Sequence, residues 1–269
     1  MLYYEQYPLR RNERTAHAWI RRNDSQMPIK VKSTVDDPHL IARRRSQLVL
    51  AAIKLFSRQG FHSTTVKDIA SQARVSAGLV YHYVHDKQDL LFLSLMHIVE
   101  TNRQEIPAAL HGVSDPLLKV KRAMDAYARV MSANRDAVLL TYRETKSLTR
   151  AYREVLKSME LDTNRLIESC IDECVALKLM QPVDTELLTY QLVVLAHAWA
   201  LKHWRLQQLT SLEDYIAHSI HSVWISKLTG PGLRRYVQLC KTEIPPHSPA
   251  PPKPRSSRVS TTRRADKGS

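Results

Sequence analysis

Apolar residues recur at three- and four-residue steps along most of this chain, the period of an α-helix packed on a core. The first clear case is residues 40–59, whose apolar face comprises Leu48, Ala51, Ala52, Leu55 and Phe56. Longer amphipathic segments are predicted at residues 115–133, 135–147, 149–178, 184–208 and 211–229. Runs of strictly alternating apolar and polar residues, which would indicate strands, are few. The pattern therefore predicts an all-α protein.

After the first helix the pattern shortens into small helices with recognisable ends. Gly60 is expected to end that helix in a left-handed conformation. Thr65 and Asp68 have the spacing of a capping box, which starts the next helix. After a three-residue turn Ser76 is a suitable N-cap, and a longer helix begins at Lys87. Two short helices joined by a tight turn predict a helix-turn-helix.

The second short helix, within "SAGLVYHYV", carries residues that suit neither a core nor open solvent. Val80 and Val84 are four apart and are expected to face inward. The outward face then comprises Ala77, Gly78 and Tyr81, and in part Leu79, His82 and Tyr83. Small side chains let a helix enter the major groove of DNA, and tyrosine hydroxyls can reach phosphates. Lys87 and the helix N-termini at Thr65 and Ser76 are also expected to bind phosphates. The alternative is that the tyrosines pack on a neighbouring helix.

The stretch "GFHSTTVKDIASQARVSAGLVYHYVHDKQDLL" is similar to the DNA-binding domain of the TetR/AcrR family of transcriptional regulators. The matching residues are Gly60, Thr65, Ile69, Ala70, Ala73, Val75, Ser76, Gly78, Tyr81, Lys87 and Leu90. The resemblance implies a homodimeric regulator, usually a repressor, that a small molecule releases from a palindromic operator. By position it implies phosphate contacts at Thr65, Lys67, Tyr81, Tyr83 and Lys87, and base contacts near Ala77 and Leu79.

Two residues depart from the family pattern without breaking the motif. Arg74 stands where a turn glycine is common, and a left-handed conformation there would cost about 1 kcal/mol without glycine. Arg74 could instead point at a phosphate. Val84 replaces the more frequent phenylalanine and is a smaller plug under the recognition helix.

The later helices contain candidate residues for binding a small molecule. The segment "AVLLTYRETKSLTRAYREVL" is similar, more weakly, to one in family members that regulate fatty-acid and acyl-CoA metabolism. An inward-facing Arg143 beside apolar neighbours would pair with an anionic, largely apolar ligand, whereas an Arg143–Glu144 surface pair is the alternative. The candidates are Tyr127, Met131, Tyr142, Arg143, His197 and Trp199. Core or dimer-interface packing competes with a ligand role for the last two.

The predicted organisation has four parts. Residues 1–40 are a basic arm, in which Met27 is an alternative start, and residues 41–100 are the helix-turn-helix domain. Residues 101–232 form a helical ligand-binding and dimerisation domain, and residues 233–269 are a proline-rich basic tail expected to be disordered.

The formal net charge of +14 invites a nucleic-acid interpretation, but it is unevenly placed. Residues 1–46 hold ten lysines and arginines against five acidic residues, and residues 241–269 hold seven against two. The part between them is only mildly basic. Charge alone therefore does not establish DNA binding, and the helix-turn-helix must carry that prediction.

The remaining patterns argue against an enzyme, a cofactor site and a membrane protein. No phosphate-binding glycine loop, metal-ligand spacing or nucleophile motif is recognisable. Cys170 and Cys174 share a helix face without a third ligand and are expected to be buried, and three cysteines in all fit a reducing cytosol. The apolar run Leu187–Leu201 is too short to span a bilayer, and no signal peptide is visible. We therefore expect a soluble cytoplasmic protein.

The expected partners are a double-stranded DNA operator, a second copy of the chain and a small-molecule effector. The expected mechanism is an effector-dependent change in the distance between the two recognition helices of a dimer. Two alternatives stay open. One is a helical protein-interaction module whose helix-turn-helix has lost DNA binding, and the other is a DNA-binding regulator without a small-molecule effector.

Overall fold

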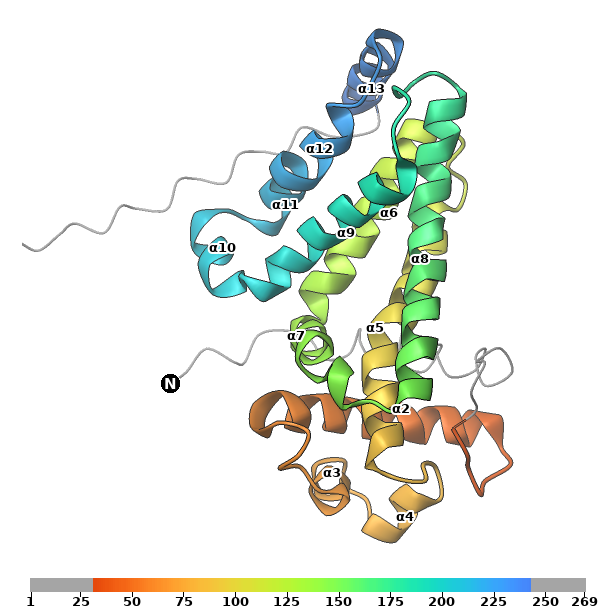
Figure 1. Cartoon of the computed structure of the whole chain (residues 1–269), viewed down its shortest axis with the longest axis vertical. Helices are drawn as coiled ribbons and strands as arrows, with labels where there is room; N and C mark the ends of the chain where they lie inside the picture. Colours follow the sequence, from red (N-terminus) through yellow and green to blue (C-terminus); the bar gives the residue numbers. More distant parts are fainter. Residues whose placement is uncertain (1–30, 243–269) are drawn as a thin grey trace, which may run out of the picture.

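A computed structural model describes residues 31–242 of the protein, and every regular element in this range is a helix. One isolated bridge joins Met180 and Leu228. The short N-terminal helices lie at one end of the molecule, and the longer helices stack above them (Figure 1). This arrangement confirms the predicted all-α fold with a small helix-turn-helix unit and a larger helical bundle.

The N-terminal unit forms as the local signals predict. Its helices are α2 (Pro38–Gln59), α3 (Val66–Gln72), α4 (Ala77–Tyr81) and the first turns of α5 (Lys87–Leu110). Thr65 and Asp68 close a full capping box, and the Leu79 amide donates to Ser76 Oγ at 3.2 Å. Phe56, Ile69 and Val80 are completely buried between these helices.

Two turn residues of the N-terminal unit adopt positive φ. Arg74 has φ +56°, as expected for the position where a glycine is common. Gly60 has φ +85° with ψ 160°, so its backbone is not left-handed helical as predicted. The positive φ still explains the glycine, because other residues rarely adopt it.

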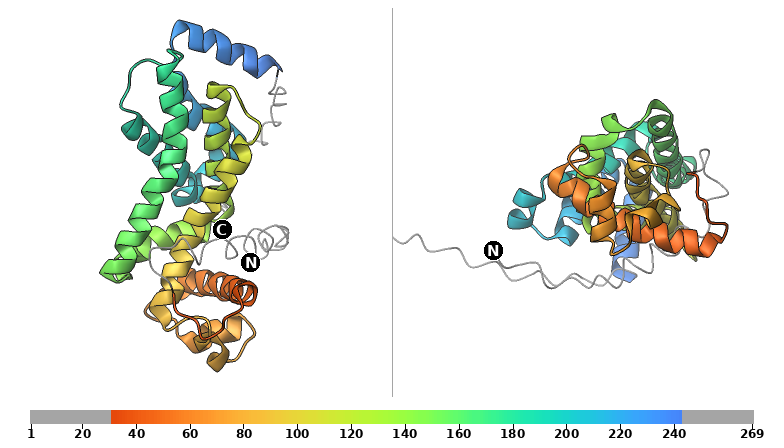
Figure 2. Two further views of the ribbon diagram at one scale, coloured as in Figure 1. Left: turned by 90° about the vertical axis from the view of Figure 1, so that its right-hand side faces the viewer. Right: turned by 90° about the horizontal axis from the view of Figure 1, so that it is seen from below.

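The larger tier is a bundle built around the long helix α5. Its further elements are α6 (Pro116–Ala133), α7 (Arg135–Glu144), η1 (Thr145–Ser147), α8 (Arg150–Ala176), α9 (Thr185–Leu201), α10 (His203–Leu209), α11 (Leu212–Tyr215), the π-helical turn η2 (Ile216–His221), α12 (Ser222–Ile225) and α13 (Gly230–Thr242). Helix α5 rises from the N-terminal unit and packs against α6, α7 and α8 (Figure 2). Among the described helices none is both long and apolar enough to cross a membrane.

Both predicted ends of the folded part need correction. Helix α2 starts at Pro38, and Val31 is already buried, so the basic arm cannot extend to residue 40 as predicted. Helix α13 continues to Thr242, inside the predicted disordered tail, and its Tyr236 packs edge-on against Trp224. The rest of the predicted arm, including Met27, and the tail beyond Thr242 lie outside the described residues.

One predicted helix is also interrupted. The segment 184–208 divides into α9 and α10 at Lys202, whose φ of −114° and ψ of 22° leave the helical range. The apolar period continues across this break, so sequence alone does not reveal it. The kink turns α10 outward and leaves Trp204 67% exposed.

Candidate functional site

The helix-turn-helix presents most of its predicted DNA-facing residues at the free end of the molecule (Figure 1). Exposed positions are Thr65, Lys67, Ser76, Gly78, Tyr81 and His82, and half-buried positions are Ala77 and Leu79. A Cβ at Gly78 would meet nothing within 4 Å, so no contact with the described part of the protein requires a glycine there. The small residue instead leaves room for something outside the chain, as expected of a helix entering a groove.

Tyr83 does not belong to this face. Its side chain is only 3% exposed, because α4 ends at Tyr81 and the following turn directs Tyr83 into the core. Its carbonyl accepts a hydrogen bond from Arg45 Nε at 2.9 Å. The predicted phosphate contact of Tyr83 is therefore wrong for this conformation, since the prediction carried the helical period past the end of the helix.

The Lys87 side chain also makes its hydrogen bonds within the protein. Its ammonium donates to the carbonyls of Phe61 and Thr64 at 3.0 Å and of His62 at 3.3 Å, and it lies 4.5 Å from the centre of the Phe61 ring. An ammonium has three protons, and these carbonyls occupy all of them. Lys87 thus holds the turn between α2 and α3, and the prediction of a free phosphate-binding cation is not supported.

A short segment before α2 supports the end of the recognition helix. The Thr34 amide donates to the His82 carbonyl at 3.0 Å, and Thr34 Oγ1 lies 2.9 Å from His82 Nδ1. Arg45, buried on α2, donates to the Val31 carbonyl. Sequence analysis missed this segment, although an arginine four residues after Ile41 on an apolar face is a signal of a buried polar anchor.

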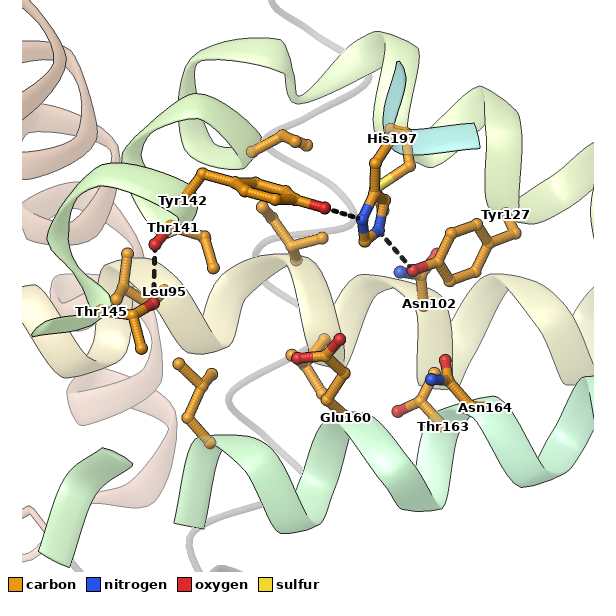
Figure 3. A pocket seen from close by; sticks show the side chains of 15 residues that line it. Leu95, Asn102, Tyr127, Thr141, Tyr142, Thr145, Glu160, Thr163, Asn164 and His197 are labelled. Carbon is orange, nitrogen blue, oxygen red and sulfur yellow. Dashed lines mark hydrogen bonds between the residues drawn. The ribbon is translucent and has the colours of Figure 1, made fainter. Parts of the chain in front are cut away.

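The larger tier contains a partly open cavity of about 340 Å³ between α5, α6, α7, α8 and α9 (Figure 3). Its apolar wall is formed by Leu95, Ile98, Val99, Met131, Val138 and Leu156. The polar lining residues include Asn102, Tyr127, Tyr142, Glu160, Asn164 and His197. No lysine or arginine lines the cavity within residues 31–242.

A histidine held by two tyrosines forms one polar part of the lining. His197 Nε2 lies 2.7 Å from the Tyr127 hydroxyl, and His197 Nδ1 lies 2.8 Å from the Tyr142 hydroxyl (Figure 3). Burial lowers the pKa of His197 to about 4 and raises the pKa of both tyrosines. At neutral pH the ring therefore carries one N–H, and the tyrosine that accepts it keeps its own proton for another partner.

The second polar part of the lining consists largely of acceptors without partners. Asn102 and Asn164 are 2% and 4% exposed. Asn102 Oδ1 and both polar atoms of Asn164 make no hydrogen bond of good geometry to any described residue, although Tyr190 lies near Asn164. The Glu160 carboxyl group points from α8 into the cavity, and burial raises its pKa (Figure 3). Unpaired buried polar groups are costly, so a binding partner from outside would stabilise them.

Four of the six predicted ligand-binding residues line this cavity, and two do not. Tyr127, Met131, Tyr142 and His197 come together there. Arg143 lies on the other side of α7, where it donates to the carbonyls of Phe56 and Ser57 on α2 and pairs with Glu144 at 3.1 Å. Trp199 is buried outside the cavity, and its indole donates to Ser132 Oγ at 3.1 Å. Helix periodicity alone could not assign these faces correctly.

Sequence analysis missed two further polar side chains that line the cavity. Asn102 falls between Ile98 and Ile106 on an apolar row of α5, and Glu160 occupies a similar row on α8. A polar residue in an otherwise apolar row is the signal that could have found them.

Comparisons with known proteins place both tiers in one family. Residues 48–92 match the family model "Bacterial regulatory proteins, tetR family", and residues 113–204 match "Tetracyclin repressor-like, C-terminal domain". The HTH-type transcriptional regulator HbdR of Aromatoleum sp. (strain CIB) is 47% identical over 190 residues, which cover 71% of this chain and 83% of the relative.

Solved structures share the fold at low sequence identity. The TetR family regulator PfmR from Thermus thermophilus matches with a TM-score of 0.58 at 20% identity, covering 66% of this chain and 96% of that one. AibR, solved in complex with isovaleryl coenzyme A and operator DNA, matches with a TM-score of 0.58 at 16% identity, covering 67% and 98%. At such identities the likeness concerns the fold alone.

Proposed function

Because this chain belongs to the TetR family of bacterial transcriptional regulators, we propose that it is a dimeric repressor that leaves a palindromic operator when a small molecule fills its cavity. One observation carries the proposal. Helix α7 lines the cavity through Val138 and Tyr142, and on its other side Arg143 holds the end of α2. A ligand that displaces α7 would therefore act directly on the DNA-binding unit.

The proposed DNA contacts combine groove entry with phosphate binding. Ala77 and Gly78 allow close approach of α4 to base edges, while the Tyr81 hydroxyl, Lys67 and the N-terminus of α3 at Thr65 reach phosphates. Two such units read a palindrome when their recognition helices are about 34–36 Å apart, one turn of B-DNA. An effector that favours another spacing weakens operator binding by its difference in affinity for the two states.

The proposed dimer interface lies on α9. Leu187, Tyr190 and Val194 are exposed at steps of three and four residues, so they form one apolar stripe on the surface of this helix. A two-fold axis would bring the same stripe of two copies together, as an isologous interface requires. The burial of such a stripe on association is a favourable hydrophobic contribution.

The proposed effector is an acyl thioester whose acyl group enters the cavity while its charged carrier stays outside. The apolar wall suits a hydrocarbon group, and the structural relative AibR binds isovaleryl coenzyme A. The absence of cationic lining residues in the described part of the chain argues against burying an anionic group there. The earlier expectation that Arg143 pairs with an anionic ligand is therefore replaced.

The first experiment is selection of bound sites from random DNA with the full chain and two matched variants. Tyr81→Phe removes an exposed hydroxyl and should weaken binding to the recovered palindrome about tenfold, the effect of losing one hydrogen bond to a charged group. Tyr83→Phe alters a buried ring in the same helix-turn-helix and should bind normally. Equal, sequence-independent recovery by all three proteins would exclude specific operator reading.

A second experiment tests release by the effector. Short- and medium-chain acyl-coenzyme A thioesters are titrated into the protein–operator complex, with Arg143→Ala as the variant that cuts the link between α7 and α2. The variant should bind the thioester normally. The factor by which the thioester weakens operator binding should be about tenfold smaller in the variant than in the parent chain, within the usual range of allosteric coupling. A DNA-bound dimer that no thioester releases would point to a regulator without this effector class.

A further inference from the structure

The unpaired acceptors of the cavity lie together at one end. Asn102 and Asn164 are both almost completely buried, and they face the cavity from α5 and α8 (Figure 3). Leu95 and Leu156 occupy earlier turns of the same two helices, closer to the DNA-binding unit. Near that unit the cavity is thus lined by leucines together with Thr141 and Thr145, whereas the unpaired amide groups lie farther along the bundle.

The end with these amide groups has more acceptors than donors to offer. Asn102 Oδ1 and Asn164 Oδ1 are acceptors without a partner of good geometry among the described residues, and the Glu160 carboxyl group beside them can also accept hydrogen bonds, whereas Asn164 Nδ2 is a donor without such a partner. Among the tyrosines, one hydroxyl of the Tyr127–His197–Tyr142 trio keeps a proton that it can donate. A group that fits here must donate to an amide or carboxyl oxygen and accept from a tyrosine.

From this juxtaposition we infer that the cavity selects an effector whose buried group carries a hydroxyl at its far end. A hydroxyl donates one hydrogen bond and accepts others, so it satisfies both demands at once. A carboxylate cannot donate and would lie against Glu160, with no cation in the described lining to offset it. The inference rests on the proposed effector role of this cavity and specifies the chemistry of its ligand.

The size of the cavity limits the group that carries the hydroxyl. About 340 Å³ is roughly twice the volume of an apolar cavity that holds one benzene molecule, about 150 Å³. This leaves room for a group of about ten non-hydrogen atoms. A hydroxylated ring or a short hydroxylated chain therefore fits, with its apolar part against the wall that includes Val99 and Met131.

The test uses four small probes of similar size with the full chain, measured by calorimetry and ligand-observed NMR. Phenol carries the hydroxyl, toluene replaces it with a methyl group, benzylamine supplies a cation and benzoate an anion. Phenol should bind about tenfold more tightly than toluene, the effect of about 1.4 kcal/mol from one well-made hydrogen bond. Benzoate should bind most weakly because of Glu160.

The variant Asn102→Leu shows whether the amide recognises the hydroxyl. It should lower the phenol-to-toluene ratio while toluene still binds, because one of the acceptors is lost. Because Asn102 Oδ1 is unpaired among the described residues, the variant should also keep the thermal stability of the parent chain. Glu160→Gln is a second variant that keeps an acceptor, so it should retain the preference for phenol and reduce the discrimination against benzoate.

The outcomes separate this inference from the proposed function. Equal binding of phenol and toluene, unchanged in Asn102→Leu, would overturn the hydroxyl preference and leave the effector cavity intact. Tightest binding of benzylamine would overturn it in favour of a cationic ligand at Glu160. Binding of none of the four probes would overturn both the hydroxyl preference and the cavity as an effector site.

Discussion

The DNA-facing unit and the cavity use polar side chains in opposite ways. At the helix-turn-helix the polar groups cap helices within three residues, as Thr65 and Asp68 do, and the outward side chains stay accessible. At the cavity the Tyr127 hydroxyl forms a hydrogen bond with His197, which is 70 residues away in the sequence, and both side chains lie in the bundle. Local chemistry therefore builds the surface that meets DNA, whereas tertiary packing builds the polar lining of the cavity.

This difference has consequences for substitution. An exposed tyrosine such as Tyr81 can be changed with little effect on folding, since its role begins only when a partner arrives. A buried group such as His197 is part of the folded state, so its protonation changes stability before any ligand is present. The comparison can be tested with stability measurements on matched residues.

The largest expected loss of stability comes from a residue that departs from this comparison, because it is polar and buried although it belongs to the DNA-facing unit. Arg45 lies in the DNA-facing unit but is 1% exposed and joins α2 to the Val31 and Tyr83 carbonyls. Arg45→Ala should lower the free energy of unfolding by about 3 kcal/mol, because several buried carbonyls lose their donor. Urea denaturation measures the change, and Arg43→Ala, an exposed neighbour, should change it by less than about 0.5 kcal/mol. Equal losses in both variants would show that the anchoring role of Arg45 is wrong.

The next largest effect is a loss of folding stability at low pH, which should come from the buried histidine at the cavity. The pKa of His197 is lowered from 6.5 to about 4 by burial, so the unfolded chain binds more protons between these values. The stabilisation is complete above pH 6.5 and is lost as the pH falls toward 4. Between pH 7 and pH 5 this histidine should cost about 2 kcal/mol of stability. His97, whose pKa burial also lowers to about 4, should add a similar amount.

Unfolding by urea at several pH values measures this dependence. The variant His197→Gln removes the contribution of His197, so its stability should fall less steeply below pH 6.5 than that of the parent chain. His62→Gln, at an exposed position of the DNA-facing unit, is the matched control and should keep the parent slope. A parent-like slope in His197→Gln would contradict the assignment to this histidine.

Sequence patterns predicted most of the helices because their signals are local. The starts at Thr65 and Ser76 depend on hydrogen bonds to amides three residues away, and these residues cap their helices as expected. The left-handed backbone at Arg74 was also expected, because the family resemblance places Arg74 where a turn glycine is common. The family resemblance of the helix-turn-helix rests on the same local register.

The cavity could be predicted only in part. The helical period shows which residues share a face of a helix, but it does not show which other helix that face contacts. Tyr142 and Arg143 are adjacent on α7, and only packing decides that one lines the cavity and the other contacts α2. Tyr83 was misplaced because the helix ended earlier than its apolar pattern suggested. The segment at Val31 has no periodic signal, and its order depends on Arg45, which follows it by 14 residues.

The smallest expected effect is a gain in stability on relieving backbone strain, which occurs at one residue in each region. Arg74 in the DNA-facing turn and Lys178 after α8 both have φ +56°, a conformation that costs a residue other than glycine about 1 kcal/mol. Arg74→Gly and Lys178→Gly should each raise the free energy of unfolding by up to about 1 kcal/mol, measured by urea denaturation. Only Arg74→Gly should also change operator binding, reducing the slope of log K against log salt by about one if Arg74 meets a phosphate. An unchanged slope would leave Arg74 as a turn residue alone, and a changed slope in Lys178→Gly would show that the bundle reaches the DNA.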